Sequence, residues 1–148
     1  MSIVRDTIDV NVPIHTAYNQ WTQFETFPEF MSAVEEVRQI DDKHLHWKVK
    51  VAGVTREWDA TITQQEPDQV IAWEAGGDTD NSGTVTFEKL AEDSTRVHAA
   101  IGYETESLKE KIGDALDLPE RQLKKDLSQF KEFIESRGQE TGAWRGQV

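Results

Sequence analysis

The fold is decided by two neighbouring stretches, His44-Leu45-His46-Trp47-Lys48-Val49-Lys50-Val51 and Arg56-Glu57-Trp58-Asp59-Ala60-Thr61-Ile62. Apolar and polar residues alternate in both, and Trp47 and Trp58 fall on the apolar parity. Alternate side chains of a β-strand point to opposite faces of a sheet. Trp73 has the same parity in a later strand-like segment. The sequence therefore predicts a sheet with wide aromatic rings on one face, which form either a thick core or the wall of an apolar pocket.

The same alternation extends outward from these two stretches. It covers residues 3–12 and most of residues 32–105, interrupted by turn residues at 41–43, 52–53, 66–68, 76–81 and 92–94. Turns at intervals of roughly ten to fourteen residues are typical of consecutive hairpins. Because short connections join antiparallel neighbours, we expect one antiparallel sheet of about seven strands.

Helical patterns flank the strands. Apolar residues recur at helical spacing from Ile14 to Trp21, directly after Pro13, which is tolerated in a first helical turn. Residues 24–31 carry three phenylalanines and a proline, and they predict a second short helix or turn. Residues 107–116 begin with the pattern of a capping box and predict a further helical segment.

A long amphipathic helix is expected before the C-terminal end. Its apolar face is formed by Leu123, Leu127, Phe130 and Ile134, and Gly138 is the expected stop. We therefore expect a single domain over residues 1–137 and a Gly-rich tail over residues 138–148. For the tail, two alternatives are open: a disordered end, or docking of Trp144 on the domain or on a second subunit of a homodimer.

Composition and charge narrow the function classes. The chain has 148 residues, no cysteine and a net charge of −12. An acidic surface repels phosphate backbones, so a nucleic-acid partner is not expected. No apolar run reaches the length of about 20 residues that a membrane span needs. The N-terminal residues do not resemble a signal peptide, and with the lack of cysteine this favours a cytoplasmic location.

Three stretches of the chain resemble a known family. They are residues 10–31, from Val10-Asn11-Val12-Pro13 to Pro28-Glu29-Phe30-Met31; residues 56–73, from Arg56-Glu57-Trp58 to Ile71-Ala72-Trp73; and residues 126–135, Asp126-Leu127-Ser128-Gln129-Phe130-Lys131-Glu132-Phe133-Ile134-Glu135. The chain is similar to the START-like helix-grip superfamily (SRPBCC), in particular to its polyketide cyclase/dehydrase and coenzyme Q-binding branch. The resemblance implies an α+β helix-grip fold, in which the long C-terminal helix packs on the concave face of a curved sheet around a hydrophobic cavity.

This arrangement predicts which residues line the cavity. The expected ligand-binding residues are the apolar ones that face inward from the sheet, the short helices and the long helix: Phe27, Phe30, Met31, Trp47, Val49, Trp58, Trp73, Phe87, Tyr103, Leu116, Leu123, Leu127 and Phe130. Sites of this kind are mostly apolar, with a few polar groups for orientation. The alternative interpretation of the tryptophans is that they are simply packed core.

Candidate catalytic residues are few. Arg56 shares the parity of Trp58, so that it either orients a carboxylate or enolate oxygen or pairs with nearby acids at the sheet edge. Tyr103 falls on an apolar parity, where it is either a weak general acid or a structural tyrosine. His44 and His46 have a chelating spacing but no evident third ligand, so neither a metal nor a cofactor is expected.

Three functions remain open from the sequence. The first is non-catalytic binding of a hydrophobic or aromatic small molecule, such as a lipid, a quinone or a polyketide-like compound. The second is a cyclase or dehydratase that uses the same cavity to orient its substrate. The third and weakest is a filled core with a role in protein interaction. Binding is favoured because no acid/base constellation stands out.

Overall fold

The computed structural model describes residues 2–51, 53–75, 81–103 and 118–146. Within these residues, seven strands form one antiparallel sheet in the order β1-β7-β6-β5-β4-β3-β2. Their bounds are β1 Ser2–Val10, β2 Val34–Gln39, β3 His44–Val51, β4 Val54–Glu66, β5 Val70–Ala75, β6 Asn81–Ala91 and β7 Ser94–Tyr103. The expected antiparallel sheet of about seven strands is confirmed.

Helices lie on one face of this sheet. The described helices are α1 (Ile14–Trp21), the 3-10 helix η1 (Phe24–Glu29) and α3 (Leu118–Arg137). Gly138 ends α3 in a left-handed conformation (φ 74°), and its amide donates to the Ile134 carbonyl over 2.9 Å. Glycine adopts this conformation without a steric cost from Cβ. The helix expected over residues 107–116 lies outside the described residues.

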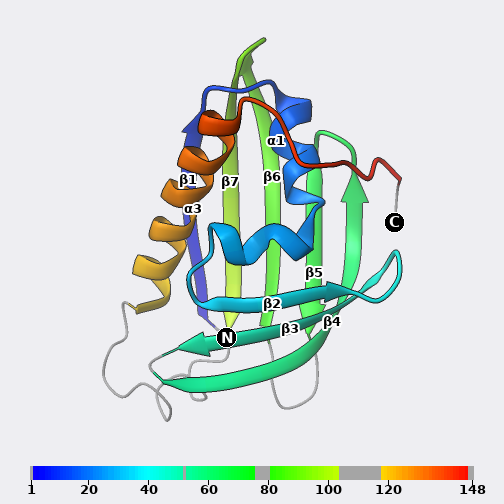
Figure 1. Ribbon diagram of the computed structural model, residues 1–148, viewed down its shortest axis with the longest axis vertical. Helices are drawn as coiled ribbons and strands as arrows, with labels where there is room; N and C mark the ends of the chain where they lie inside the picture. The colour runs from blue at the N-terminus through cyan, green and yellow to red at the C-terminus, as the bar shows by residue number, and fades with distance from the viewer. Residues whose placement is uncertain (1, 52, 76–80, 104–117, 147–148) are drawn as a thin grey trace.

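The sheet is strongly curled. Strands β1, β7, β6 and β5 run along the length of the molecule, whereas β4, β3 and β2 sweep forward at one end (Figure 1). Helices α1 and η1 lie in front of the concave face, and α3 runs beside β1. One source of the bend is a register shift between Ile62 and Gln64, because a bulge twists and bends its strand. The curled sheet with its C-terminal helix confirms the helix-grip fold.

The core lies between the curled sheet and the helices. The apolar face predicted for α3 is buried there, with Leu123, Leu127, Phe130 and Ile134 at most 8% exposed. Aromatic rings from α1, η1 and α3 meet in it: the Trp21 ring centroid is 5.3 Å from that of Phe27 and 5.2 Å from that of Phe130. Such ring contacts add to the free energy gained by burying the apolar area.

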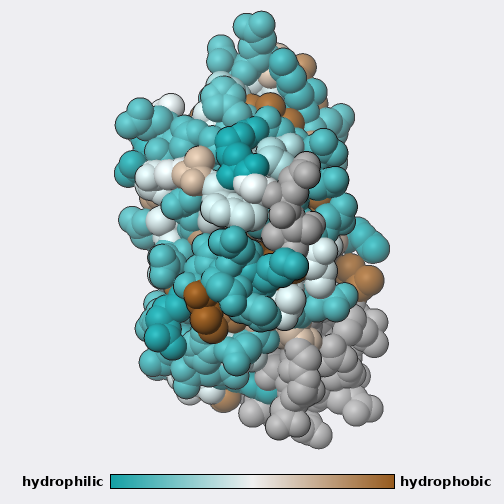
Figure 2. All heavy atoms as spheres, turned by 90° about the vertical axis from the view of Figure 1, so that its right-hand side faces the viewer, coloured by the Kyte–Doolittle hydropathy of each residue, from teal (hydrophilic) through white to brown (hydrophobic). Residues whose placement is uncertain are grey.

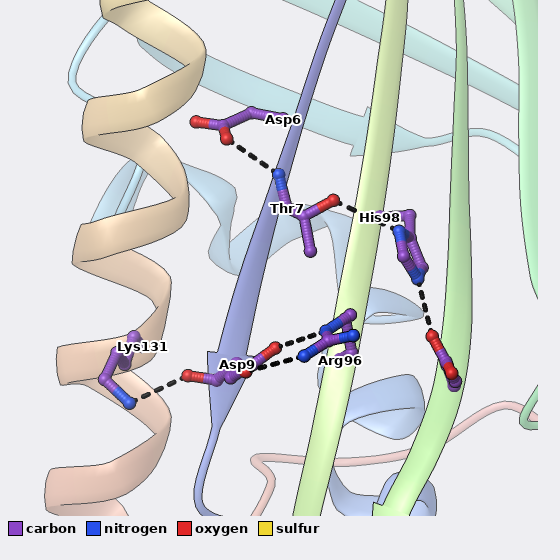
Figure 3. Close-up of polar contacts among 7 residues, drawn as sticks. Asp6, Thr7, Asp9, Arg96, His98 and Lys131 are labelled. Atoms are coloured by element: carbon purple, nitrogen blue, oxygen red, sulfur yellow. Dashed lines mark hydrogen bonds and ion pairs between the residues drawn. The ribbon is translucent and has the colours of Figure 1, made fainter.

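Polar contacts on the outer side tie α3 to the sheet (Figure 3). Lys131 Nζ on α3 donates to the Asp9 carbonyl of β1 over 2.8 Å. The Asp9 carboxylate accepts two hydrogen bonds from Arg96 on β7, at 2.8 and 3.2 Å, and this contact lowers the pKa of Asp9. Thr7 and His98 also lie within hydrogen-bonding distance, with Thr7 Oγ1 3.1 Å from His98 Nδ1. One end of α3 is therefore held at a fixed place along β1.

The segment after α3 crosses in front of α1 (Figure 1). The Thr141 amide donates to Gln20 Oε1 over 2.9 Å, and the Trp144 amide donates to Thr22 Oγ1 over 3.1 Å. We call residues 138–146 the C-terminal strap. Of the alternatives raised by the sequence, docking on the domain is the one that these described residues adopt.

The face of the molecule shown in Figure 2 is largely polar where its residues are described. Hydrophobic residues appear as small separate groups on the face shown in Figure 2. The large hydrophobic residues exposed among the described ones are Ile3, Ile40 and Leu90, which lie on different strands or turns. None of the described helices combines the length and the hydropathy that a membrane span requires.

Candidate functional site

The inner face of the β3–β4 hairpin changes gradually from buried to accessible. The register pairs are Leu45 with Ala60, Trp47 with Trp58, and Val49 with Arg56. Leu45 and Ala60 are 0% and 2% exposed, Trp47 is 6% exposed, and Trp58, Val49 and Arg56 are half-buried. All six alternate with outward-facing residues, so they share the concave face. Solvent therefore reaches the concave face at the turn end of this hairpin.

The three tryptophans form one stacked group on this face. The rings of Trp47 and Trp58 are nearly parallel, at 10°, with centroids 6.3 Å apart. Trp73 also stacks on Trp47, at 24° and with centroids 6.0 Å apart. They come from three consecutive strands, as the alternation predicts, and together they present a broad π-surface.

Other expected ligand-binding residues are packed more tightly. Phe27, Phe30 and Phe130 are fully buried among aromatic rings, and Phe27 reaches the tryptophan group with its centroid 5.8 Å from that of Trp47. Leu123 and Leu127 are buried on α3, whereas Met31 is half-buried. The phenylalanines join the tryptophan group to α3 as a continuous aromatic core. The part of the predicted lining that solvent reaches is Met31, Val49 and Trp58.

Phe87 lies in a different neighbourhood. Its ring contacts Tyr18 of α1 edge-to-face, with centroids 5.4 Å apart. The side chain of Tyr103 and the whole of Leu116 lie outside the described residues. Their proposed contribution to the site stays a prediction.

Two indole N–H groups of the tryptophan stack have no acceptor in the part of the chain that the structure describes. Trp47 Nε1 and Trp58 Nε1 are buried, and no described residue accepts a hydrogen bond from either. Buried Trp N–H groups normally find a partner, because leaving a donor unsatisfied costs free energy. The stack therefore combines an apolar surface with two donors that match an oxygen atom.

Arg56 lies where the sequence places it. It is half-buried and alternates with exposed Thr55 and Glu57, so it shares a face of β4 with Trp58. Its backbone pairs with Val49 at the accessible end of the hairpin. A guanidinium at this position is suited to a carboxylate or a carbonyl oxygen.

The histidines lie apart from this site. His46 points outward from β3, with Nδ1 2.7 Å from Asp59 Oδ1 and Nε2 3.1 Å from Glu57 Oε1, and these carboxylates raise its pKa. His44 Nδ1 lies 2.8 Å from Asp41 Oδ1. In the part of the chain that the structure describes, no three His, Asp or Glu side chains are grouped to hold a metal ion.

Three polar residues were missed by the sequence analysis. Gln65 and Tyr18 are fully buried with unpartnered polar atoms, and Asp126 on α3 is half-buried with its pKa raised to about 6 by loss of hydration. The Gln122 amide donates to Asp126 Oδ1 over 2.7 Å and partly offsets the effect of burial. No local pattern marks Tyr18 or Asp126 as polar sites, and the bulge before Gln65 changes the parity that would have identified it.

Comparisons with known proteins agree with the fold. The family described as polyketide cyclase/dehydrase and lipid transport matches residues 10–132. An uncharacterized 17.2 kDa protein of Streptomyces lincolnensis, from the melC2-rnhH intergenic region, is 53% identical over 149 residues, which cover 100% of this chain and 99% of that one.

Solved structures of other proteins share this fold. The crystal structure of DR_A0006 from Deinococcus radiodurans has 29% identity and a TM-score of 0.73, covering 92% of this chain and 99% of that one. The Zhui aromatase/cyclase from Streptomyces sp. R1128 has 16% identity and a TM-score of 0.75, covering 97% and 99%. Because only 16% of the residues are identical, the similarity to the Zhui aromatase/cyclase shows a shared fold and not a shared activity. With the family match covering most of its length, the chain belongs to the polyketide cyclase/dehydrase and lipid transport family.

Proposed function

We propose that the protein binds a hydrophobic or aromatic small molecule against the tryptophan stack, without chemically changing it. The observation that carries this proposal is the inner face of the β3–β4 hairpin. There, a half-buried Trp58 lies on the concave face and stacks on Trp47. An aromatic surface that solvent reaches within a concave fold is suited to a flat apolar ligand.

The unpartnered indole groups narrow the ligand class. Trp47 Nε1 and Trp58 Nε1 are donors only, so they favour a ligand with an acceptor oxygen. Quinones and polyketide-like compounds carry carbonyl oxygens on or beside a flat body, whereas a hydrocarbon does not. Of the ligands in our first hypothesis, these two therefore fit better than a simple lipid chain.

The test is direct binding by isothermal titration calorimetry, with 1,4-naphthoquinone, palmitate and anthracene as probes. Native mass spectrometry of the freshly purified protein, before and after denaturation, would show any ligand that copurifies. We expect 1,4-naphthoquinone to bind, and we expect Trp58→Leu to weaken its binding about tenfold, through loss of stacking and of one hydrogen bond.

Trp144→Leu is the matched control, because Trp144 lies in the C-terminal strap and not in the stack. It should leave the affinity for 1,4-naphthoquinone unchanged. The proposal is wrong if none of the three probes binds, or if the two tryptophan substitutions have the same effect.

A cyclase or dehydratase is the second candidate, and Arg56 is the observation that favours it. One structural neighbour, Zhui, is an aromatase/cyclase, and here a half-buried guanidinium shares the face of Trp58. A cation at that position stabilises an enolate that forms during ring closure. If the protein is an enzyme, Arg56→Gln should abolish turnover of a poly-β-ketone chain while changing its affinity little. If the protein only binds, the same substitution should change affinity alone.

A further inference from the structure

We propose that the Tyr18 hydroxyl and the Gln65 amide form a buried subsite for the neutral head group of the bound molecule, a hydroxyl or a carboxamide. This inference rests on the proposed binding function and extends it to the other end of the ligand. The two residues come from α1, which lies in front of the concave face, and from the inner side of β4 near its end.

The bulge in β4 is what turns Gln65 inward. Ile62 pairs with Trp73, but the next paired residue, Gln64, is opposite Ala72, so that Thr63 is the extra residue. Beyond this shift, Gln65 pairs with Ile71 and is 0% exposed, whereas Thr63 and Gln64 are exposed. A glutamine is thereby placed among core residues.

Both polar groups lack a hydrogen-bond partner among the described residues. No described residue forms a hydrogen bond with Tyr18 Oη, Gln65 Nε2 or Gln65 Oε1, although both side chains are fully buried. The Gln65 amide lies near enough to the Tyr18 hydroxyl to oppose the rise in its pKa, yet it does not satisfy the hydroxyl by a hydrogen bond. Buried polar groups in native proteins are nearly always paired, so these atoms are suited to a partner that the described residues do not supply.

The C-terminal strap covers this end of the fold. The Arg145 guanidinium lies 5.6 Å from the Tyr18 ring centroid, donates to Asn19 Oδ1 over 2.7 Å and pairs with Asp68 Oδ2 at 2.8 Å. The second carboxylate oxygen of Asp68 is buried, with no partner among the described residues. The strap residue Arg145 and its partner Asp68 therefore lie as a charged pair near Tyr18.

The chemistry of the groups indicates a neutral ligand group. Burial raises the pKa of Tyr18 above its ordinary value, although Gln65 and Arg145 oppose this rise, so the phenol stays protonated. The subsite therefore offers donors, the Tyr18 O–H and the Gln65 N–H groups, together with an acceptor, the Gln65 carbonyl. A hydroxyl or a carboxamide both donates and accepts. The charge of Arg145 is already paired with Asp68 and therefore favours an anion little, and an alkyl group would leave all the polar atoms unpaired.

The subsite is continuous with the tryptophan stack. Gln65 pairs with Ile71, and Trp73 lies two residues further along the same face of β5. Two residues of a strand span about 7 Å, which is close to the length of a fused bicyclic aromatic ring system. A ligand whose body lies beside the edge of Trp73 would therefore reach Tyr18 and Gln65 with a polar group at its far end.

The test compares naphthalene with 2-naphthol, which differ by one hydroxyl. Dissociation constants of both are measured by calorimetry for the unaltered protein, Gln65→Met, Tyr18→Phe and the control Gln64→Met. Gln64 is exposed on the same strand, so its substitution makes the same chemical change outside the core. The readout is the ratio of the two dissociation constants, compared between the proteins, because the difference in probe hydrophobicity is the same for every protein and cancels in that comparison.

We expect the unaltered protein to bind 2-naphthol about tenfold or more tightly than naphthalene. Gln65→Met or Tyr18→Phe should remove most of that preference. Binding of naphthalene should remain, and Gln64→Met should keep the preference. Removing a single unpartnered polar group leaves the packing volume nearly unchanged, and thermal unfolding would verify that both variants fold.

Two outcomes overturn the inference. If naphthalene and 2-naphthol bind but their ratio is the same in all four proteins, the polar pair does not contact the ligand and holds only a water or itself. If neither probe binds the unaltered protein, the proposed binding function fails for bicyclic aromatics, and the head-group subsite fails with it.

Discussion

The indole ring of Trp73 lies directly over Gly83, its register partner on the neighbouring strand β6. A Cβ at position 83 would fall on this ring, within 2.7 Å of its Cη2 atom. Because Gly83 has no side chain, the Trp73 ring can lie against its backbone at one edge of the tryptophan stack. In sheets, a glycine often marks such a close approach.

Gly83→Ala should displace Trp73 and destabilise the protein. We expect a loss of about 1–3 kcal/mol in the free energy of unfolding, which is typical of overpacking in a core, measured by urea denaturation. Tryptophan emission should shift as the ring moves. Ser82→Ala on the same strand is the control, and an unchanged midpoint and emission in Gly83→Ala would show that the ring does not depend on the glycine.

Strand alternation explains why the tryptophan stack was predictable. Trp47, Trp58 and Trp73 face one side because side-chain direction follows from parity, and short turns make their strands neighbours. Gln65 was not predictable, because the single extra residue before it reverses the parity. The strap was beyond reach for another reason: its contacts join Asn19 and Gln20 to residues more than a hundred positions away, and no local pattern records them.

Asp126→Asn should stabilise the protein at neutral pH. The carboxyl loses hydration beside Gln122 and the Ser32 backbone, which raises its pKa to about 6 from 3.8. With a raised pKa in the folded state, ionisation favours unfolding, so stability falls as pH rises from about 4 to about 6. Allowing for partial solvent screening, ionisation of Asp126 should lower the free energy of unfolding by about 1–3 kcal/mol above about pH 6.

The measurement for Asp126 is urea unfolding of both proteins across this window. The advantage of Asp126→Asn should be near zero at about pH 4 and largest above about pH 6. Glu132→Gln, on an exposed position of the same helix, removes an acid without a buried environment and serves as the control. An advantage of Asp126→Asn that is equal at all pH values would contradict the assigned cause.

His46 should titrate above its ordinary value of 6.5, because Asp59 and Glu57 stabilise its protonated form. NMR of the ring protons measures this directly. Asp59→Asn should lower the midpoint more than Glu57→Gln, since the contact with Asp59 is shorter, 2.7 against 3.1 Å, and is the larger cause. The stability that the raised pKa contributes is full below about 6.5 and is lost as pH rises through the folded value.

The control for His46 is Glu88→Gln, because Glu88 lies beside His98 on the β6–β7 side of the sheet. It should leave the His46 midpoint unchanged. A His46 midpoint at or below 6.5 in the unaltered protein would show that the cross-strand carboxylates do not stabilise its charge.

Arg145→Gln should loosen the C-terminal strap. The substitution removes the pair with Asp68 and the contact with the Tyr18 ring. Because the ion pair is partly exposed, we expect a loss of about 1 kcal/mol in unfolding free energy, with most of the effect confined to the strap. Hydrogen exchange should accelerate at the amides of Thr141 and Trp144, which donate to Gln20 and Thr22. Lys124→Gln makes the same charge change on exposed α3 and should leave both amides protected. If the amides of Thr141 and Trp144 also stay protected in Arg145→Gln, the hydrogen bonds to Gln20 and Thr22 hold the strap, and the guanidinium does not contribute to its stability.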